Sequence, residues 1–155
     1  MSTTVHFDTL DHIGVLTIES PPVNAISADV TSGLEKALDA FEADTQLRAL
    51  VICCAGRTFV AGGDIKAFED PHFSAARFNQ TLARIENQTR PVVAALHGHV
   101  LGGGLELAMA CHARVALPRT RLGLPEITLG ILPGSLGTQR LPRLIPANMA
   151  LDMML

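Results

Sequence analysis

Hydrophobic and polar residues alternate in two segments near the start of the chain, residues 5–7 and 13–18. A period of two is typical of strands with one buried face, so these segments predict a pair of strands around a turn at residues 10–12. Residues 49–55 and 92–96 are apolar throughout. Short runs of this kind indicate strands that are covered on both faces.

Helices are predicted where apolar residues recur every three or four positions. Between Val30 and Phe41 this spacing marks one helix, for which Ser27 or Asp29 can serve as the N-cap. Further elements are predicted as helices at about 75–87, from the glycines 102–104 to about 111 and from about 135 onward, and as a strand at 113–117. Strands that alternate with helices predict an α/β fold.

The length of 155 residues fits one domain that can bury a substantial core. Its last seven residues are largely apolar and contain no helix-capping residue. Met149, Ala150, Met153 and Met154 would share one helical face that nothing else in the sequence covers. We therefore expect either a covering subunit or a domain, residues 1–155, that is truncated at its C-terminal end.

Composition narrows the class of protein. The chain is 48% hydrophobic and 17% charged, which disfavours disorder, and it lacks the Trp and Tyr of nucleic-acid stacking surfaces. It shows neither a secretion signal nor an apolar run near the roughly 18 residues of a membrane span, so we expect a cytoplasmic protein. Residues 1–111 carry a net charge of −6 and residues 112–155 one of +3. Ordinary surface variation explains this difference as well as a patch that faces polyphosphate.

Two glycine-rich segments are candidates for chemistry, residues 59–66 and 98–106. Glycine allows a ligand to approach the backbone closely, and free N–H groups at a helix start favour developing negative charge. Two such N–H groups that converge on one oxygen would form an oxyanion hole, although two tight turns would leave the same pattern. Neither segment has the spacing of a dinucleotide-binding motif or a P-loop.

Two glutamates lie among apolar neighbours. Glu106 falls in the first turn of the helix predicted after the glycine run, and Glu126 lies between Pro125 and Ile127. Burial raises the pKa of a carboxyl group, which suits general acid–base catalysis. A carboxylate stabilised by a helix N-terminus, without any catalytic role, would occupy similar positions.

Other candidate residues carry less weight. His97 and His99 lack a third ligand at suitable spacing, so no metal site is expected. Ser135 is not in the Gly-x-Ser-x-Gly pattern of a hydrolase nucleophile. Three cysteines are expected to be buried thiols in a reducing compartment, Cys53, Cys54 and Cys111. Four arginines are expected at the surface, where they could meet phosphate, Arg119, Arg121, Arg140 and Arg143.

Four ordered motifs resemble the crotonase (enoyl-CoA hydratase/isomerase) superfamily over nearly the whole chain. They are Asn-Ala-Ile at 24–26, Phe-Val-Ala-Gly-Gly-Asp-Ile-Lys at 59–66, His-Gly-His-Val-Leu-Gly-Gly-Gly-Leu-Glu-Leu-Ala at 97–108, and Leu-Gly-Leu-Pro-Glu-Ile-Thr-Leu-Gly at 122–130, which continues to Gln-Arg-Leu at 139–141. The sequence looks most like the hydratase part of multifunctional fatty-acid oxidation enzymes, and it corresponds to the N-terminal portion of the family domain.

The resemblance implies a spiral of ββα units, without the C-terminal helical region of the family. It implies that the amides of Gly63 and Gly103 form the oxyanion hole, and that Glu106 and Glu126 activate water and deliver a proton. The coenzyme A moiety is expected along two backbone segments, comprising Asn24, Ala25, Ile26, Gly63, Asp64, Ile65 and Lys66.

The presence of both glutamates favours hydration of a trans-2-enoyl-CoA to the 3-hydroxyacyl-CoA in fatty-acid β-oxidation. Two alternatives stay open. One is a Δ3–Δ2 enoyl-CoA isomerase, in which Glu126 moves one proton between carbons, and the other is a truncated acyl-CoA binder without activity. No separate cofactor is expected, since coenzyme A is part of the substrate. The resemblance also implies a homo-oligomer built on trimers.

Overall fold

The computed structural model describes residues 4–62 and 74–155. Its elements in chain order are β1 (Val5–Leu10), β2 (Ile13–Ile18), α1 (Ala28–Ala43), β3 (Ala49–Cys54), β4 (Val60–Ala61), α2 (Ala75–Glu86), β5 (Val92–Leu96), β6 (His99–Leu101), α3 (Gly103–Ala110), β7 (Ala113–Ala116), β8 (Arg121–Gly123), the 3-10 helix η2 (Pro125–Leu129), α4 (Gly137–Leu144) and α5 (Ala147–Asp152). No helix within these two ranges is long and apolar enough to cross a membrane.

The strands form two sheets. A five-stranded sheet has the order β1-β2-β3-β5-β7, in which β1 and β2 are antiparallel and the other neighbours are parallel. A smaller parallel sheet has the order β4-β6-β8. From β3 onward, consecutive strands alternate between the two sheets, and a helical segment follows each pair. This repeat confirms the predicted α/β fold built from ββα units.

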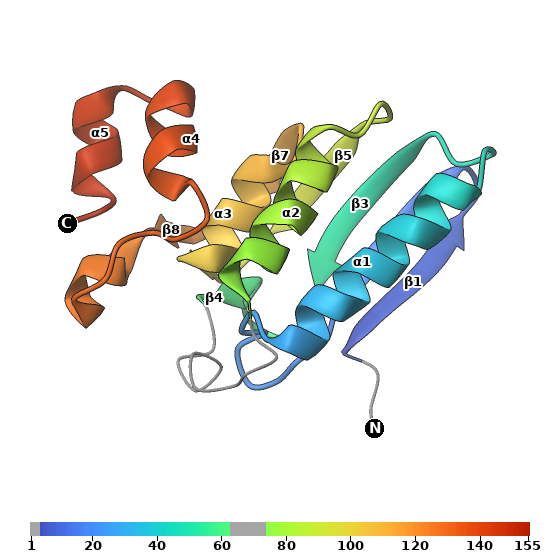
Figure 1. Cartoon of the computed structure of the whole chain (residues 1–155), viewed down its shortest axis with the longest axis horizontal. Helices are drawn as coiled ribbons and strands as arrows, with labels where there is room; N and C mark the ends of the chain where they lie inside the picture. The colour runs from blue at the N-terminus through green and yellow to red at the C-terminus, as the bar shows by residue number, and fades with distance from the viewer. Residues whose placement is uncertain (1–3, 63–73) are drawn as a thin grey trace.

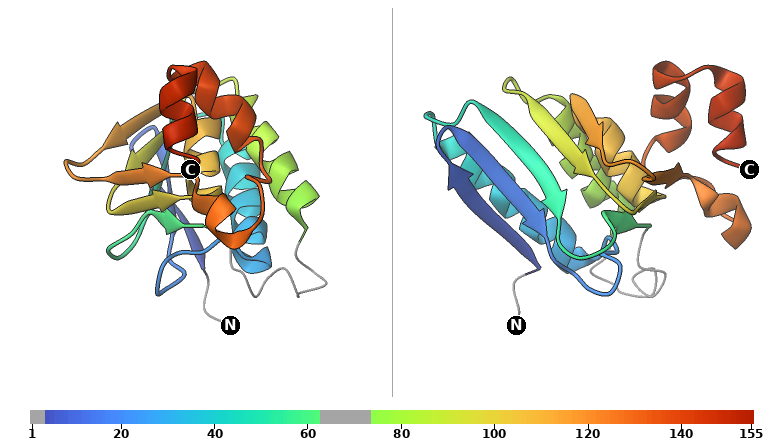
Figure 2. Two further views of the ribbon diagram at one scale, coloured as in Figure 1. Left: turned by 90° about the vertical axis from the view of Figure 1, so that its left-hand side faces the viewer. Right: turned by 180° about the vertical axis from the view of Figure 1, so that it is seen from behind.

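The helices form a layer on one face of the five-stranded sheet. Helices α1, α2 and α3 lie side by side across that face, and α4 and α5 extend the row beyond the edge of the sheet (Figures 1 and 2). Each helix contacts the next one in the chain. The site described below lies where the end of this row meets the small sheet.

Alternation within the strands places the core between sheet and helices. In β3, Leu50 and Ile52 are fully buried, whereas Ala49, Val51 and Cys53 are partly exposed. The prediction that residues 49–55 are covered on both faces is therefore wrong, because α1, α2 and α3 lie on a single face of this sheet. Those helices contribute the matching apolar side chains, among them Leu34, Leu38, Phe41, Leu82 and Ile85.

Helix starts follow the predicted capping chemistry. The Ser27 hydroxyl accepts a hydrogen bond from the Val30 amide at 3.2 Å, which makes Ser27 the N-cap of α1. Ser74 caps α2 in the same way through the Arg77 amide. The strands β4 and β6 were not anticipated, because two or three residues are too few to show a period of two.

Two expectations about buried groups need correction. Cys111 is buried, but Cys53 and Cys54 are only partly buried, because they lie at the end of β3. At the end of the chain, Ala150 is buried and Met153 and Met154 pack against the core, whereas Met149 is half exposed. The expected uncovered stripe is thus wrong for three of its four residues, since the Met153 carbonyl accepts a hydrogen bond from the Leu124 amide and holds this segment beside β8.

Candidate active site

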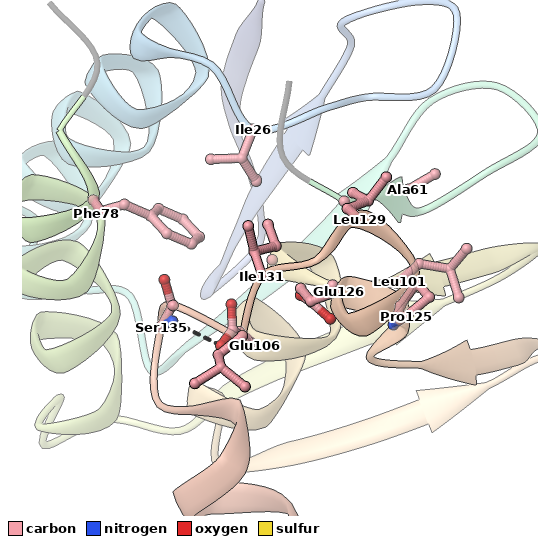
Figure 3. A pocket seen from close by; sticks show the side chains of 16 residues that line it. Ile26, Ala61, Phe78, Leu101, Glu106, Pro125, Glu126, Leu129, Ile131 and Ser135 are labelled. Atoms are coloured by element: carbon pink, nitrogen blue, oxygen red, sulfur yellow. Dashed lines mark hydrogen bonds between the residues drawn. The ribbon is translucent and has the colours of Figure 1, made fainter. Parts of the chain in front are cut away.

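A cavity of about 340 Å³ opens between α2, the start of α3 and residues 125–135 (Figure 3). Most of its wall is apolar, and two carboxyl groups, those of Glu106 and Glu126, face it. The residues that line it are Ile26, Ala61, Gly62, Ala75, Phe78, Leu101, Gly102, Gly103, Glu106, Pro125, Glu126, Leu129, Ile131, Leu132, Gly134 and Ser135. The structure therefore brings together parts of all four sequence motifs around one space.

The three glycines at the start of α3 each have a geometric role. Gly102 has a φ of 53°, and a Cβ there would lie 2.8 Å from Oε1 of Glu126. A Cβ on Gly104 would lie 2.4 Å from the Val60 carbonyl oxygen, so only glycine lets α3 pack this closely against β4. Gly103 is the first residue of α3 and lines the cavity. Because the first N–H groups of a helix have no intrahelical acceptor, its amide is available to a ligand oxygen.

The pairing of β4 with β6 brings the two glycine segments together. Ala61 lies opposite Leu101 in the parallel register, so Gly62 follows beside Gly102. A Cβ on Gly102 would lie 3.3 Å from the Gly62 Cα. The next residue, Gly63, lies outside the described residues, as do Asp64, Ile65 and Lys66. A second oxyanion-hole amide at Gly63 thus stays a prediction, supported by this register.

Glu106 is buried and fixed by backbone amides. Its side chain is 2% exposed, and Oε1 accepts hydrogen bonds from the amides of Ser135 and Gly137, each at 2.8 Å. Burial raises the pKa of this carboxyl group above its usual range, and the two amides partly oppose that rise. The orientation of Glu106 is consequently defined before any ligand binds.

Glu126 lies in the first turn of η2 and is 9% exposed. Among the described residues nothing donates a hydrogen bond to its buried Oε2 atom. Burial raises the pKa of Glu126, and the negative charge of Glu106 raises it further. A carboxyl oxygen that is buried, unpaired and adjacent to an apolar cavity is well placed to exchange a proton with a bound molecule.

Arg140 was expected at the surface, and this expectation is wrong. The residue is 9% exposed, and its Nη1 donates to the Ser135 carbonyl at 2.8 Å. Its Nε and Nη2 bind both carboxylate oxygens of Glu86, at 3.1 and 2.8 Å. Arg140 can be buried because every side of its guanidinium group is paired. Arg140 and Leu141 follow the buried Gly137 by three and four residues, and this helical spacing is the sequence signal that could have placed Arg140 inside.

The Asn24–Ile26 segment contributes to the site in two ways. Asn24 is buried, and its side-chain amide donates to the carbonyls of Ala55 and Thr58 while its Oδ1 accepts from the Ser20 amide. These bonds engage the side chain within the loop, so contact with a ligand would have to involve the backbone. Ile26 lines the cavity, whereas Ala25 is not among the lining residues.

The two candidate histidines are not among the residues that line this cavity. The Nε2 atom of His97 lies 3.2 Å from the Gly56 carbonyl oxygen, and His99 is exposed. Across residues 4–62 and 74–155, no three histidine, cysteine or acidic side chains are grouped as metal ligands. Ser135 does line the cavity, where its amide serves Glu106.

Comparison with known proteins agrees with this geometry. The sequence profile of the enoyl-CoA hydratase/isomerase family matches residues 8–155. A protein named "Probable enoyl-CoA hydratase" from Bacillus subtilis (strain 168) is 48% identical over 91% of this chain and 57% of its own length. The human "Peroxisomal bifunctional enzyme" is 43% identical over 91% of this chain and 20% of its own length.

Solved structures show the same arrangement. An enoyl-CoA hydratase from Bacillus anthracis superposes with a TM-score of 0.89 at 31% identity, over 97% of this chain and 62% of that one. DspI from Pseudomonas aeruginosa gives a TM-score of 0.91 at 31% identity, over 99% and 65%. The chain therefore spans less than two thirds of the length of these relatives. By its profile match, sequence identity and fold, it belongs to the enoyl-CoA hydratase/isomerase family, the crotonases.

Proposed function

We propose that this chain carries the hydration site for a trans-2-enoyl-CoA thioester, with the 3-hydroxyacyl-CoA as product. The observation that carries the proposal is the pair of buried carboxyl groups, Glu106 and Glu126, that face one apolar cavity at the start of α3. Hydration needs two proton-handling groups, because one proton leaves water while another reaches carbon. The relatives named as enoyl-CoA hydratases support the same reaction.

The different surroundings of the two acids suggest different roles. Two amides donate to Glu106 and oppose the rise in its pKa that burial causes, so we assign it to orient water and accept a proton. Burial raises the pKa of Glu126, and the negative charge of the nearby Glu106 raises it further, so we assign Glu126 to deliver a proton to C2. The water oxygen bonds to C3, and the electron pair of the C2–C3 double bond moves toward the thioester carbonyl. The addition is complete when C2 takes up the proton from Glu126.

Negative charge on the thioester oxygen requires donors that are already in place. Gly103 supplies one N–H at the N-terminus of α3, where the helix dipole also favours negative charge. In this proposal the Gly63 amide supplies the second. The apolar side chains of Ile26, Phe78, Leu101, Leu129 and Leu132 would surround the acyl chain. Coenzyme A would lie along the backbone of Asn24–Ile26 and Gly63–Lys66, without a separate cofactor.

A Δ3–Δ2 enoyl-CoA isomerase is the second candidate. The unpaired Oε2 of Glu126 favours it, because one carboxyl group can carry a proton between C2 and C4 of the acyl chain without any water. The two reactions share the oxyanion hole but differ in the source of the atoms in the product.

Two incubations of the purified chain in H₂¹⁸O, one with a trans-2-enoyl-CoA and one with a 3-enoyl-CoA, separate these functions. Hydration predicts one ¹⁸O atom at C3 of the product, detected by mass spectrometry. Isomerisation predicts that the 3-enoyl-CoA is converted to a 2-enoyl-CoA that contains no ¹⁸O. If the chain binds an acyl-CoA and catalyses neither reaction, the hydration proposal fails, and the chain is an acyl-CoA binder.

A further inference from the structure

The amides that orient Glu106 belong to a turn that begins at Gly134 and leads into α4. Ser135 and Gly137 both donate to Oε1 of Glu106. Between them, Leu136 has a φ of 65°, which lies in the left-handed backbone region that residues other than glycine rarely adopt. A turn in this conformation persists only when its surroundings hold it.

Two carbonyl groups of the turn, those of Gly134 and Ser135, accept hydrogen bonds that connect the turn to α2. The side-chain amide of Asn79 donates to the Gly134 carbonyl at 3.2 Å. Arg140 donates through Nη1 to the Ser135 carbonyl at 2.8 Å, and its remaining nitrogens bind Glu86, the last residue of α2. An Arg–carboxylate pair with two parallel bonds fixes the guanidinium plane, so Nη1 has a defined direction.

Arg140 also acts on Glu106 through its charge. The positive charge lowers the pKa of Glu106, against the larger effect of burial, which raises it. The elements around Glu106 carry the acids Glu126 of η2 and Glu86 of α2 and the cations Arg77 and Arg84 of α2, Arg140 and Arg143 of α4 and Arg114 of β7. Arg77 and Arg84 pair with Glu35 and Glu42 of α1, and Arg143 is exposed. Arg114 binds the Ala108 and Cys111 carbonyls at the other end of α3, and His99 of β6 is exposed. Among residues 4–62 and 74–155, Arg140 is therefore the cation coupled to the Glu106 end of α3.

We propose that Arg140 is a positioning residue for Glu106. Bound to Glu86, it holds the turn at 134–137 in the conformation from which the amides of Ser135 and Gly137 fix the carboxylate. The kinetic consequence of this inference rests on the proposed hydratase function. The structural consequence, a fixed orientation of the Glu106 carboxylate, does not depend on that function.

A titration of Glu106 tests the structural part without any turnover. The chain, labelled with ¹³C at glutamate side-chain carboxyls, is titrated by NMR, and the Glu106 signal is assigned with Glu106→Gln. We expect Arg140→Gln to raise the pKa of Glu106 and to shift the amide proton signals of Ser135 and Gly137. Arg143→Gln is the matched control, because Arg143 lies on the same helix and is exposed. A folded Arg140→Gln chain with the wild-type Glu106 titration would overturn the inference.

Kinetics test the functional part. Arg140→Gln is expected to lower kcat by roughly 10–100-fold with little change in KM, because misplacement of a catalytic group by about 1 Å can cost that much. The limb of the pH–rate profile that reports Glu106 should move to higher pH. Arg140→Lys keeps the positive charge but loses the two parallel hydrogen bonds to Glu86. The limb of its pH–rate profile that reports Glu106 should therefore stay near that of wild type, while kcat falls. Similar kcat and pH profiles in Arg140→Gln and Arg143→Gln would contradict the inference.

The two proposals can fail separately. If the wild-type chain hydrates no enoyl-CoA but Arg140→Gln still raises the pKa of Glu106, the function is wrong and the positioning role stands. If Arg140→Gln does not fold, Glu86→Gln replaces it, since Glu86 is half exposed and the variant leaves the Arg140 charge in place. Unchanged amide signals of Ser135 and Gly137 in Glu86→Gln would then overturn the inference.

Discussion

Residues up to 117 and residues from 118 onward build the site in different ways. Of the 30 buried hydrophobic side chains among the described residues, 27 belong to the first region, and the second contributes Leu124, Leu141 and Ala150. Of the 14 large hydrophobic side chains that are exposed, 10 belong to the second region. The first region is organised by an apolar core, and the second is attached to it by few apolar contacts.

The proposed catalytic groups come from both regions. Gly103 and Glu106 belong to α3, which is buried along nearly its whole length. Glu126 and the amides that orient Glu106 belong to the second region, where defined polar contacts such as the Arg140–Glu86 pair take the place of a core. The comparison suggests that substitutions in the first region chiefly affect stability, whereas polar substitutions in the second chiefly affect geometry and turnover.

The largest expected effect concerns the acids, one from each region. Glu106→Gln and Glu126→Gln should each lower kcat for enoyl-CoA hydration by roughly 10²–10⁴, the usual contribution of an acid or base. Acyl-CoA affinity, measured by calorimetry, should change much less, because neither variant alters the shape of the cavity. Near-normal turnover in either variant would remove that residue from the mechanism and leave its region without a catalytic acid or base.

Truncation of a large hydrophobic side chain should lower stability much more in the first region than in the second. Leu38→Ala deletes a fully buried side chain of α1 and should lower the free energy of unfolding by about 2–5 kcal/mol. Leu132→Ala removes a side chain that is 79% exposed, so its effect should stay within about 0.5 kcal/mol. Urea titrations measure both. Equal losses would show that the second region contributes more to stability than its burial indicates.

The sequence predicted the first region better than the second. Strands β2 and β5 match their predicted bounds, and the Ser27 cap and the apolar face of α1 are confirmed, because local periodicity and capping decide these features. In the second region the stretch from about 135 proved to be two helices, α4 and α5. Its polar contacts join residues that are far apart in the chain, so no local pattern could show them.

Three residues of the candidate site were predicted from the sequence, but the groups that support them were not. Glu106, Glu126 and Gly103 were identified from glycine and acid patterns and from the family resemblance, and they do line one cavity. Ser135 was set aside because it is not in a Gly-x-Ser-x-Gly pattern, and Arg140 was set aside because it was expected at the surface. Their role follows from a hydrogen-bond path across α2, α3 and α4, which only the three-dimensional fold supplies.

A glycine substitution tests whether geometry dominates in the second region. A Cβ on Gly137 would lie 2.9 Å from Oε1 of Glu106 and 3.0 Å from the Leu124 Cδ1 atom. Gly137→Ala should therefore displace the carboxylate and lower kcat by roughly 10–100-fold, with a smaller effect on the unfolding midpoint. Gly123→Ala is the control, because its Cβ would meet atoms no closer than 3.6 Å. Equal kcat values for the two variants would show that Glu106 tolerates displacement.

The smallest expected effect is a difference in how stability depends on pH. Burial raises the pKa of Glu126 above its usual value near 4.5, so the folded chain binds more protons than the unfolded chain between those two values. Stability contributed by this group therefore falls as pH rises through that interval. Glu35, in the first region, has the opposite sign, because its hydrogen bond with Arg77 lowers its pKa. Its contribution is present above the usual value and is lost as pH falls through the lowered one.

Urea unfolding of two variants between pH 3 and pH 8 measures this difference. Glu126→Gln should be more stable than wild type at neutral pH, and the two curves should converge as the pH falls below the usual glutamate pKa. Glu35→Gln should be less stable than wild type at neutral pH and should approach it in acid. The Glu126 result would mean that the site keeps a charge whose burial costs stability, in the region with the smaller core. If Glu126→Gln loses stability at neutral pH, the carboxylate is stabilised rather than strained by its surroundings, and its assignment as the proton donor to C2 loses its physical basis.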